Sequence, residues 1–248
     1  MLPFQTVLCA LDFEPGSERA LVQAADLAER AHAALHLVHA NPLFRARLAP
    51  TPGDPDAAFR GRVERFVNGA LGADDAFDVL APAVHETRGQ AAASAVAGCA
   101  ADVGADLVVV GTHGRGGLGH LLLGSVAAET LRRSPVPVLV VPDRAGRPRA
   151  GRPVLVAVDE PDPAVAALGA ALADAYGSPV ALAPPVEVHV VEGRPAAELV
   201  ALAERLGAGA VVMGTHGRSG WGRLRLGSVA EWTVRHAPCP VLVVPGAA

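Results

Sequence analysis

Short apolar runs alternate with longer segments of mixed polarity along most of the chain. Thr6–Leu11 (TVLCAL) is almost unbroken in its hydrophobicity and is followed by Asp12, which is typical of a parallel strand buried on both faces. Residues 18–32 instead carry alanine and leucine at the spacing of an amphipathic helix that packs on such a sheet. This alternation predicts βαβ units and a parallel sheet.

The same alternation continues through the first half of the chain. Strands are predicted at residues 34–39, within 79–86, at 106–110 and at 137–141, and helices at 57–71, 90–103 and Ser125–Arg133, with a proline-rich loop at 41–55. We therefore expect residues 1–145 to form a doubly wound domain with five parallel strands.

A second domain is expected over residues 152–248, after a basic Gly/Pro linker at 143–152. It restarts with a strand at 153–158, a helix capped by Asp162 and begun by Pro163, and another helix begun by Pro195. Between the first helix and the glycine before the next long helix, residues 177–192 replace residues 33–88 of the first half. Since a parallel crossover needs about a dozen residues or more, one βα unit is missing or collapsed into a single strand or hairpin.

A long internal repeat joins a strand to a helix in each half. Residues 108–125 (VVVGTHGRGGLGHLLLGS) and 211–228 (VVMGTHGRSGWGRLRLGS) are near copies, and extending both to the next proline gives 24 identities in 35 positions. A repeat this strong predicts two tandem copies of one architecture.

The repeat carries the pattern G-x-x-G, nine residues, then G-S. Its fixed points are Gly111, Gly114, Gly124 and Ser125, repeated as Gly214, Gly217, Gly227 and Ser228. Glycines allow positive φ and close backbone approach, and the helix beginning at the serine offers free N–H groups, which together suit a phosphate. Asp12 and Asp159 end the first strand of their halves, where a carboxylate suits ribose hydroxyls. The alternative is that the glycines only make a tight connection, but the double occurrence favours phosphate binding.

Composition excludes several classes of protein. All 21 basic residues are arginine, so the lysine of a Walker A loop, a Schiff base or a kinase is absent. The net charge of −4 divides evenly between the halves, so neither half has the excess of basic residues expected of a nucleic-acid-binding protein. The chain has no apolar run long enough to span a membrane and no basic start typical of a signal peptide, so we expect a cytoplasmic protein. Cys9, Cys99 and Cys239 are widely spaced and are expected to be buried reduced thiols.

These motifs, with the strand-end aspartate and the closing SVAE…RHAPCPVLVV of residues 228–244, resemble the universal stress protein (UspA) family in its tandem two-domain form. The resemblance covers nearly the whole chain and is weakest across residues 40–80 and 177–190. It implies two α/β, Rossmann-like domains related to the adenine nucleotide alpha-hydrolases, the second shortened by about one βα unit. It also implies that the strands Val138–Val141 and Val241–Val244 pair domain to domain as an internal pseudo-dimer, which could dimerise again.

The family's ATP-binding branch carries this glycine pattern, and the resemblance implies site residues position by position. Asp12 would contact the ribose, the backbone near His39 and Ala40 would meet the adenine, and the ribose and phosphates would be held by Gly111, Gly114, Gly124, Ser125 and the Val126 amide. The matching residues of the second half are Asp159, Gly214, Gly217, Gly227, Ser228 and Val229. That half shows no evident second strand and helix, so its site is expected to be degenerate.

Several nearby residues have more than one interpretation. Arg115 and Arg218 could reach a phosphate as bidentate donors or be solvated loop charges. His113 and His216 could donate to phosphate or cap local backbone groups. For Ser125, helix capping is favoured over a nucleophilic role, because no base stands at a fixed spacing.

The leading hypothesis is a stress-response protein that binds ATP, ADP or AMP as a sensor or regulator without efficient catalysis, with an unidentified protein partner. Mg²⁺ or Mn²⁺ could accompany the phosphates and be shared with Asp12, whereas the protein alone offers no metal site: His32 and His36 lack a third ligand. A slow ATPase or nucleotidyl-transfer enzyme is one alternative, and a nucleotide-free interaction scaffold is another.

Overall fold

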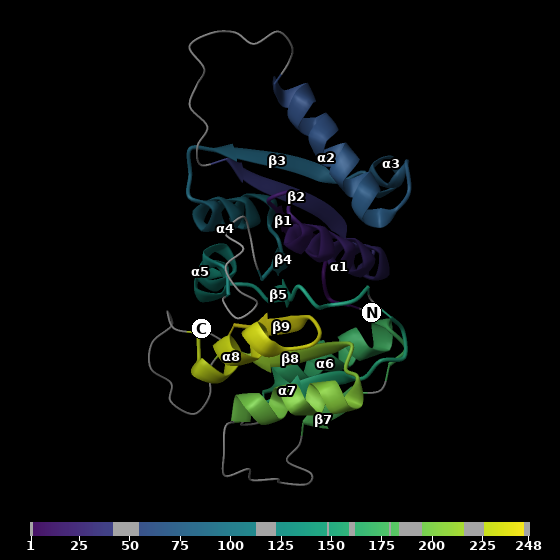
Figure 1. The fold of residues 1–248 in the computed structure, drawn as a ribbon, viewed down its shortest axis with the longest axis vertical. Helices are drawn as coiled ribbons and strands as arrows, with labels where there is room; N and C mark the ends of the chain where they lie inside the picture. Colours follow the sequence, from purple (N-terminus) through teal and green to yellow (C-terminus); the bar gives the residue numbers. More distant parts are fainter. Residues whose placement is uncertain are drawn as a thin grey trace.

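The computed structural model describes residues 2–41, 55–112, 123–147, 149–158, 162–178, 180–183, 195–215 and 226–245. Its strands form one nine-stranded sheet in the order β3-β2-β1-β4-β5-β9-β8-β6-β7. Helices cover both faces of this sheet, and the two halves of the chain lie one above the other (Figure 1). Within the described part, no helix is both long enough and apolar enough to cross a membrane.

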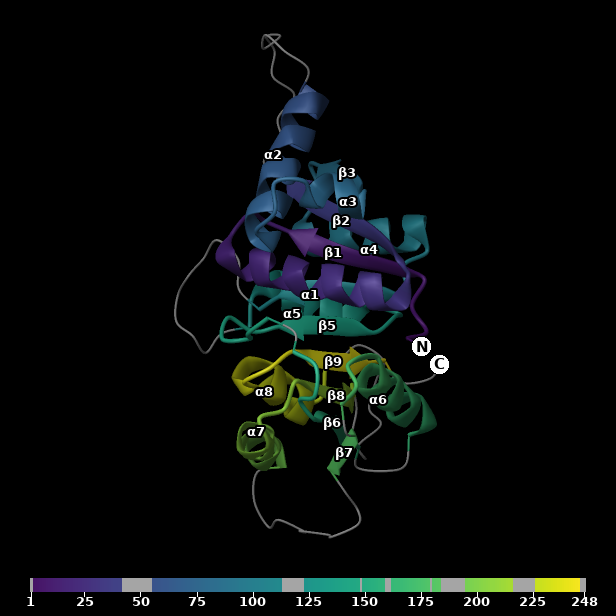
Figure 2. The same cartoon turned by 90° about the vertical axis from the view of Figure 1, so that its right-hand side faces the viewer.

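The first half is the expected doubly wound domain with five parallel strands. Its strands are β1 (Thr6–Leu11), β2 (Ala34–Asn41), β3 (Ala83–Arg88), β4 (Leu107–Gly111) and β5 (Val138–Val141), and its helices are α1 (Pro15–Ala31), α2 (Pro55–Leu71), α3 (Ala76–Leu80), α4 (Ala92–Val103) and α5 (Ser125–Arg133). All neighbouring strands of this half pair in parallel. α1 covers one face of the sheet, and α4 and α5 cover the other (Figure 2).

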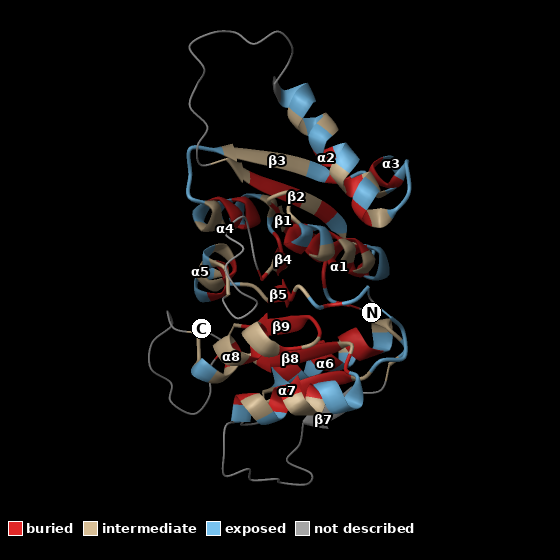
Figure 3. Cartoon of the chain, viewed as in Figure 1, coloured by how far each residue is buried: buried red, intermediate tan, exposed pale blue. Residues whose placement is uncertain are grey.

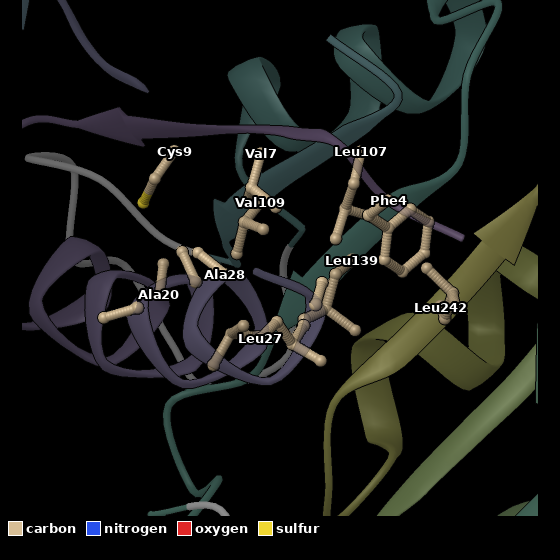
Figure 4. Close-up of a cluster of buried hydrophobic side chains, with 14 of the residues drawn as sticks. Phe4, Val7, Cys9, Ala20, Leu27, Ala28, Leu107, Val109, Leu139 and Leu242 are labelled. Carbon is tan, nitrogen blue, oxygen red and sulfur yellow. The ribbon is translucent and has the colours of Figure 1, made fainter. Parts of the chain in front are cut away.

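The central strands explain the unbroken apolar runs of the sequence. On β4, Leu107 and Val109 belong to the core on the α1 side, while Val108 and Val110 belong to the core on the opposite side. Figure 4 shows Val109 above Ala28 of α1, and Leu107 beside Phe4. The central strands are accordingly buried, whereas the outward faces of the helices are exposed (Figure 3). A strand with helices on both sides needs apolar residues at every position.

The second half repeats this order with four strands. Its elements are β6 (Val154–Ala157), α6 (Pro163–Ala175), β7 (Val180–Ala183), α7 (Pro195–Leu206), β8 (Ala210–Gly214), α8 (Ser228–His236) and β9 (Val241–Val244). β7 pairs in parallel with β6 as β2 pairs with β1, so the second strand that the sequence did not make evident is present. The expected shortening by about one βα unit, collapsed into a single strand, is confirmed. β7 has only four residues, too few to establish a hydrophobic period in the sequence. Among the described residues, the elements without a counterpart are α2, α3 and β3.

The cap predicted for α6 is present. The Asp162 carboxylate accepts hydrogen bonds from the N–H groups of Ala164 (2.9 Å) and Val165 (3.2 Å), and Pro163 is the first helical residue. The cap satisfies two N–H groups that the first turn of a helix cannot pair internally.

The two halves join through their last strands, which confirms the expected internal pairing. β5 and β9 run antiparallel, with Leu139 opposite Leu242, and Figure 4 shows these two side chains meeting near Phe4. A second contact joins α1 to the end of α6: Arg30 bonds Asp26 (2.9 Å) and donates to the Ala175 carbonyl (2.9 Å). Pairing the strands removes two apolar sheet edges that would otherwise template aggregation.

Candidate nucleotide-binding site

The first half has its topological switch point between β1 and β4. From β1 the chain moves to β2 and β3 on one side, and β4 and β5 lie on the other. In open α/β sheets, ligands bind in the crevice beyond the carboxyl ends of the strands at this point. Asp12 directly follows β1 and Gly111 ends β4, so the structure brings these two predicted residues to the same edge.

A tight turn holds Asp12 at the end of β1. Its Oδ1 accepts a hydrogen bond from the Glu14 N–H (3.0 Å), and its own N–H donates to the Ser17 hydroxyl (3.3 Å). Phe13 between them has a φ of 64°, a left-handed conformation that few residues other than glycine adopt. The side chain of Asp12 is half-buried, and its Oδ2 makes no hydrogen bond to any described residue. One carboxylate oxygen is thus used to fix the turn, and the other is open to a ligand.

An aromatic cluster, which sequence analysis missed, lies beside Asp12. The Phe13 ring is 4.7 Å from the His39 ring and 5.3 Å from the Phe66 ring, and the Phe59 ring lies 5.8 Å from His39. The Arg62 guanidinium stands 3.8 Å over the Phe13 ring. Phe59 and Phe66 stand seven residues apart on α2, which places them on one face of the helix. This spacing was the feature of the sequence that could have predicted part of the cluster.

His39 itself is buried at the carboxyl end of β2. Its Nδ1 donates to the Leu11 carbonyl (2.8 Å), and because a carbonyl only accepts, the proton is on Nδ1. Its backbone oxygen accepts from the Thr87 hydroxyl at 3.5 Å, and Ala40 pairs with Thr87 in the β3 register. The two positions predicted to face the adenine therefore lie beside the end of β1, with His39 contributing its ring to the cluster.

Gly111 has a packing role in addition to any role in binding. A Cβ added there would lie 2.7 Å from the carbonyl oxygen of Gly16 at the start of α1. This close approach favours the tight-connection interpretation for this one glycine. It also sets the distance between α1 and the end of β4.

The glycine loop of the first half is closed at its neck by backbone hydrogen bonds. The Gly124 N–H donates to the Thr112 carbonyl (2.7 Å), and the Thr112 N–H donates to the Val141 carbonyl (3.0 Å). Residues 113–122 lie outside the described residues, and with them the predictions for His113, Gly114 and Arg115. The neck fixes where the loop leaves the sheet and where α5 begins.

α5 begins without a side-chain cap, which corrects the capping role expected for Ser125. The cap residue is Gly124, whose carbonyl accepts the first helical bond from Ala128 (2.9 Å), and Ser125 is the first helical residue. Glycine has no side chain to offer the first turn. The N–H groups of Ser125, Val126 and Ala127 therefore have no partner within the helix, and they carry the positive end of its dipole.

The second half repeats the neck and the helix start. The Gly227 N–H donates to the Thr215 carbonyl (2.9 Å), the Thr215 N–H donates to the Val244 carbonyl (3.1 Å), and Gly227 caps α8 without a side-chain bond. Ser228 and Val229 open α8 as Ser125 and Val126 open α5, and Gly214 ends β8. Asp159, His216, Gly217 and Arg218 lie outside the described residues.

The three cysteines are buried and reduced, as expected. Burial, reinforced by the nearby Asp12 carboxylate, raises the pKa of the Cys9 thiol well above its ordinary value. Burial also raises the pKa of Cys99 to about 11, with a smaller contribution from Asp102. Neutral thiols of this kind are poor nucleophiles and poor metal ligands.

The two histidines considered as metal ligands, His32 and His36, lie on different elements and do not form a common site. His32 ends α1, whereas His36 lies on β2 with its Nδ1 3.0 Å from the Nε2 of His85 on β3. Within the described part of the chain, no group of three His, Cys, Asp or Glu side chains is arranged to hold a metal ion.

Comparison with known proteins identifies the family. The sequence pattern of the "Universal stress protein family" matches residues 3–142 and 178–245. A universal stress protein of Methanocaldococcus jannaschii is 51% identical over 61 residues, which are 24% of this chain and only 36% of that protein. A universal stress protein solved in complex with cAMP is 31% identical, over 56% of this chain and 98% of its own, with a TM-score of 0.41.

The whole fold also has a counterpart among solved structures. A functionally unknown protein of Pseudomonas aeruginosa aligns over 98% of this chain and 93% of its own with a TM-score of 0.70, at 17% identity. This likeness extends across both halves and the sheet that joins them. With two matched segments that together span most of its length, the chain belongs to the universal stress protein family, in a tandem two-domain form.

Proposed function

We propose that this protein binds an adenine nucleotide at the switch point of its first half and acts as a cytoplasmic sensor or regulator. The observation that carries the proposal is that two complementary groups follow the carboxyl ends of the neighbouring strands β1 and β4. These are the Asp12 carboxylate after β1 and the uncapped start of α5, which is held beside β4 by the neck of the glycine loop. A ribose hydroxyl suits the first group, and a phosphate suits the second.

The phosphates would be held without lysine. The chain has none, so the charge must be met by backbone N–H groups, by the dipole of α5 and by arginine. Val126 and Ser125 supply N–H groups from the described residues, and Gly114 and Arg115 are the predicted contributors from the loop. A divalent cation would arrive with the phosphates, and Asp12 could share it through its open oxygen.

The base would lie toward the end of β2. Phe13 and His39 place aromatic rings next to Asp12, and α2 backs them with Phe59 and Phe66. This cluster supports a complete site in the first half. The described part of the second half holds no counterpart of α2, which supports a degenerate second site.

Isothermal titration calorimetry with ATP, ADP, AMP and cAMP tests the proposal, and the chain supplies its own matched control. Asp12→Asn and Asp159→Asn remove the same charge from corresponding positions. We expect one nucleotide per chain, with affinity about tenfold to a hundredfold weaker in Asp12→Asn, because a hydrogen bond to a charged group is lost. Asp159→Asn should bind as wild type. Two equal sites, or no response to Asp12→Asn, would contradict the proposal.

Mass spectrometry of small molecules released from freshly purified protein separates the alternatives. Bound nucleotide that stays intact over hours supports a sensor. ADP or AMP formed from ATP, and abolished by Asp12→Asn, would instead favour slow hydrolysis or nucleotidyl transfer. Protein that purifies empty and whose melting temperature no nucleotide raises would favour a scaffold.

A further inference from the structure

A cavity of about 290 Å³ lies at the junction of the two halves, away from the candidate nucleotide site. One wall comes from α1 and β5, and the other from α6 and the segments that lead into β6, β8 and β9. It shares no lining residue with the candidate nucleotide site. The lining residues that matter here are Leu27, Leu139, Val154, Leu172, Tyr176 and Cys239. Figure 2 shows α1 and α6 side by side on this face of the sheet.

The lining of the cavity is strongly positive. Arg144, Arg147, Arg149 and Arg152, all from the linker, line it, and no Asp or Glu is among the described residues that do so. The linker's single acid, Asp143, pairs with Arg19 at 3.0 Å and does not line the cavity. Such a set of like charges around one concave space raises the local concentration of anions.

The contacts of the four arginines leave most of this charge uncompensated. Arg144 donates to the Ala237 carbonyl and Arg147 to the Ala70 carbonyl, both at 3.1 Å, and neutral carbonyls carry no opposite charge. Arg144 also stands 4.0 Å from Glu204, with both side chains about half exposed, where solvent screens the attraction. Among the described residues, neither Arg149 nor Arg152 forms an ion pair, and both are exposed.

The charge reaches the wall of the cavity. Burial raises the pKa of the Cys239 thiol to about 12, while Arg152 and Arg144 act in the opposite direction. Arg144, Arg152 and Cys239 all line this cavity. The remaining wall includes the apolar side chains of Leu27, Leu139, Val154 and Leu172, together with Gln23 and Tyr176.

We propose that this linker cavity binds a compact organic phosphate with at least two negative charges. Guanidinium groups match a phosphate through paired N–H donors, and the leucines and Val154 accept a small apolar or aromatic body. The volume is near the lower end of the range for small-molecule sites, which favours a compact ligand over a whole nucleoside triphosphate. Because both halves line the cavity, the ligand would also bridge them.

Calorimetric titration with phenyl phosphate, and with inorganic phosphate for comparison, tests this site in the full chain. The pair Arg149→Gln with Arg152→Gln removes the two arginines that lack ion pairs. The matched control is Arg65→Gln with Arg205→Gln, which removes the same charge from exposed residues that do not line the cavity. We expect phenyl phosphate to bind more tightly than inorganic phosphate, and its affinity to fall about tenfold per arginine removed from the cavity.

Three further measurements make the assignment specific. The control pair should bind phenyl phosphate as wild type, and Arg149→Lys with Arg152→Lys should weaken binding because lysine keeps the charge but not the planar fork. The variant with Arg149→Gln and Arg152→Gln should keep wild-type affinity for ATP, and Asp12→Asn should keep wild-type affinity for phenyl phosphate. The proposal for the cavity and the proposal for the nucleotide site can therefore be refuted separately. Unchanged binding in the cavity pair, equal loss in the control pair, or no binding to wild type would overturn the proposal.

Discussion

Replacing Gly111 by alanine is expected to destabilise the fold and to weaken the candidate nucleotide site together. Gly111 ends β4, and a Cβ there would lie 2.7 Å from the carbonyl oxygen and 2.8 Å from the carbonyl carbon of Gly16. Both are backbone atoms, so no side-chain rotation relieves the contact. Ordinary contact needs 3.4 Å or more, so α1 must move away from β4 by several tenths of an ångström.

The packing of α1 sets the size of the effect. The helix rests on the sheet through small buried side chains, among them Ala20, Ala24 and Ala28. Because these fit closely, a displaced helix opens gaps along its length, and forced shifts in a packed core cost about 1–3 kcal/mol. The same shift moves Glu14 and Ser17, which hold Asp12. We therefore expect lower ATP affinity as well.

Urea unfolding followed by circular dichroism measures the first effect, and calorimetry with ATP measures the second. Gly98→Ala is the matched control: Gly98 lies exposed in α4, and its added Cβ would meet nothing within 4 Å. That change should stabilise the chain by about 0.5–1 kcal/mol, because alanine favours helix over glycine. The reasoning is refuted if Gly111→Ala unfolds at the wild-type urea concentration and binds ATP with wild-type affinity.

Two further changes probe local features. Asp162→Ala should lower the free energy of unfolding by about 1 kcal/mol, since it removes the cap from α6, whereas Asp74→Ala, at an exposed position outside the helices, should leave the urea midpoint unchanged. Burial and the nearby His85 lower the pKa of His36 from its ordinary 6.5, so its neutral form favours the folded state. That contribution to stability is complete above pH 6.5 and is lost as the pH falls below it. His36→Gln should therefore flatten the pH dependence of the urea midpoint between pH 7.5 and 5.5. An unchanged pH dependence in this variant would contradict the reasoning.

Elements whose ends are marked by capping or turn residues could be predicted to the residue. β1 ends at Leu11 because Asp12 follows an apolar run, and α6 begins at Pro163 because Asp162 caps it. α7 begins at Pro195 and is closed by Gly207, whose φ is 59°. In each case the signal lies within a few residues of the boundary, where capping and turn chemistry act.

Elements that depend on distant partners could not be predicted in this way. The strand sought in residues 79–86 begins only at Ala83, because Val79 belongs to the short helix α3 and is 75% exposed, a valine without a core behind it. Ser125 was expected as a cap, but Gly124 already starts the helix with its own carbonyl. The aromatic cluster and the linker cavity each bring together segments far apart in the sequence, so a local pattern marks only parts of them, such as the spacing of Phe59 and Phe66 on α2 and the arginines of the linker.

The direction of the strands has a consequence for how the two glycine loops relate. β4 is parallel to β5 and β8 is parallel to β9, while β5 and β9 are antiparallel. The carboxyl ends of β4 and β8 therefore point in opposite directions, so these two strand ends do not belong to one shared site. Each must be completed by its own half, and in the described chain only the first half adds α2 and its aromatic side chains beside the strand-end aspartate. We therefore expect one nucleotide per chain rather than two, although the loop is duplicated, because a half without α2 and its aromatic side chains lacks a surface for the base.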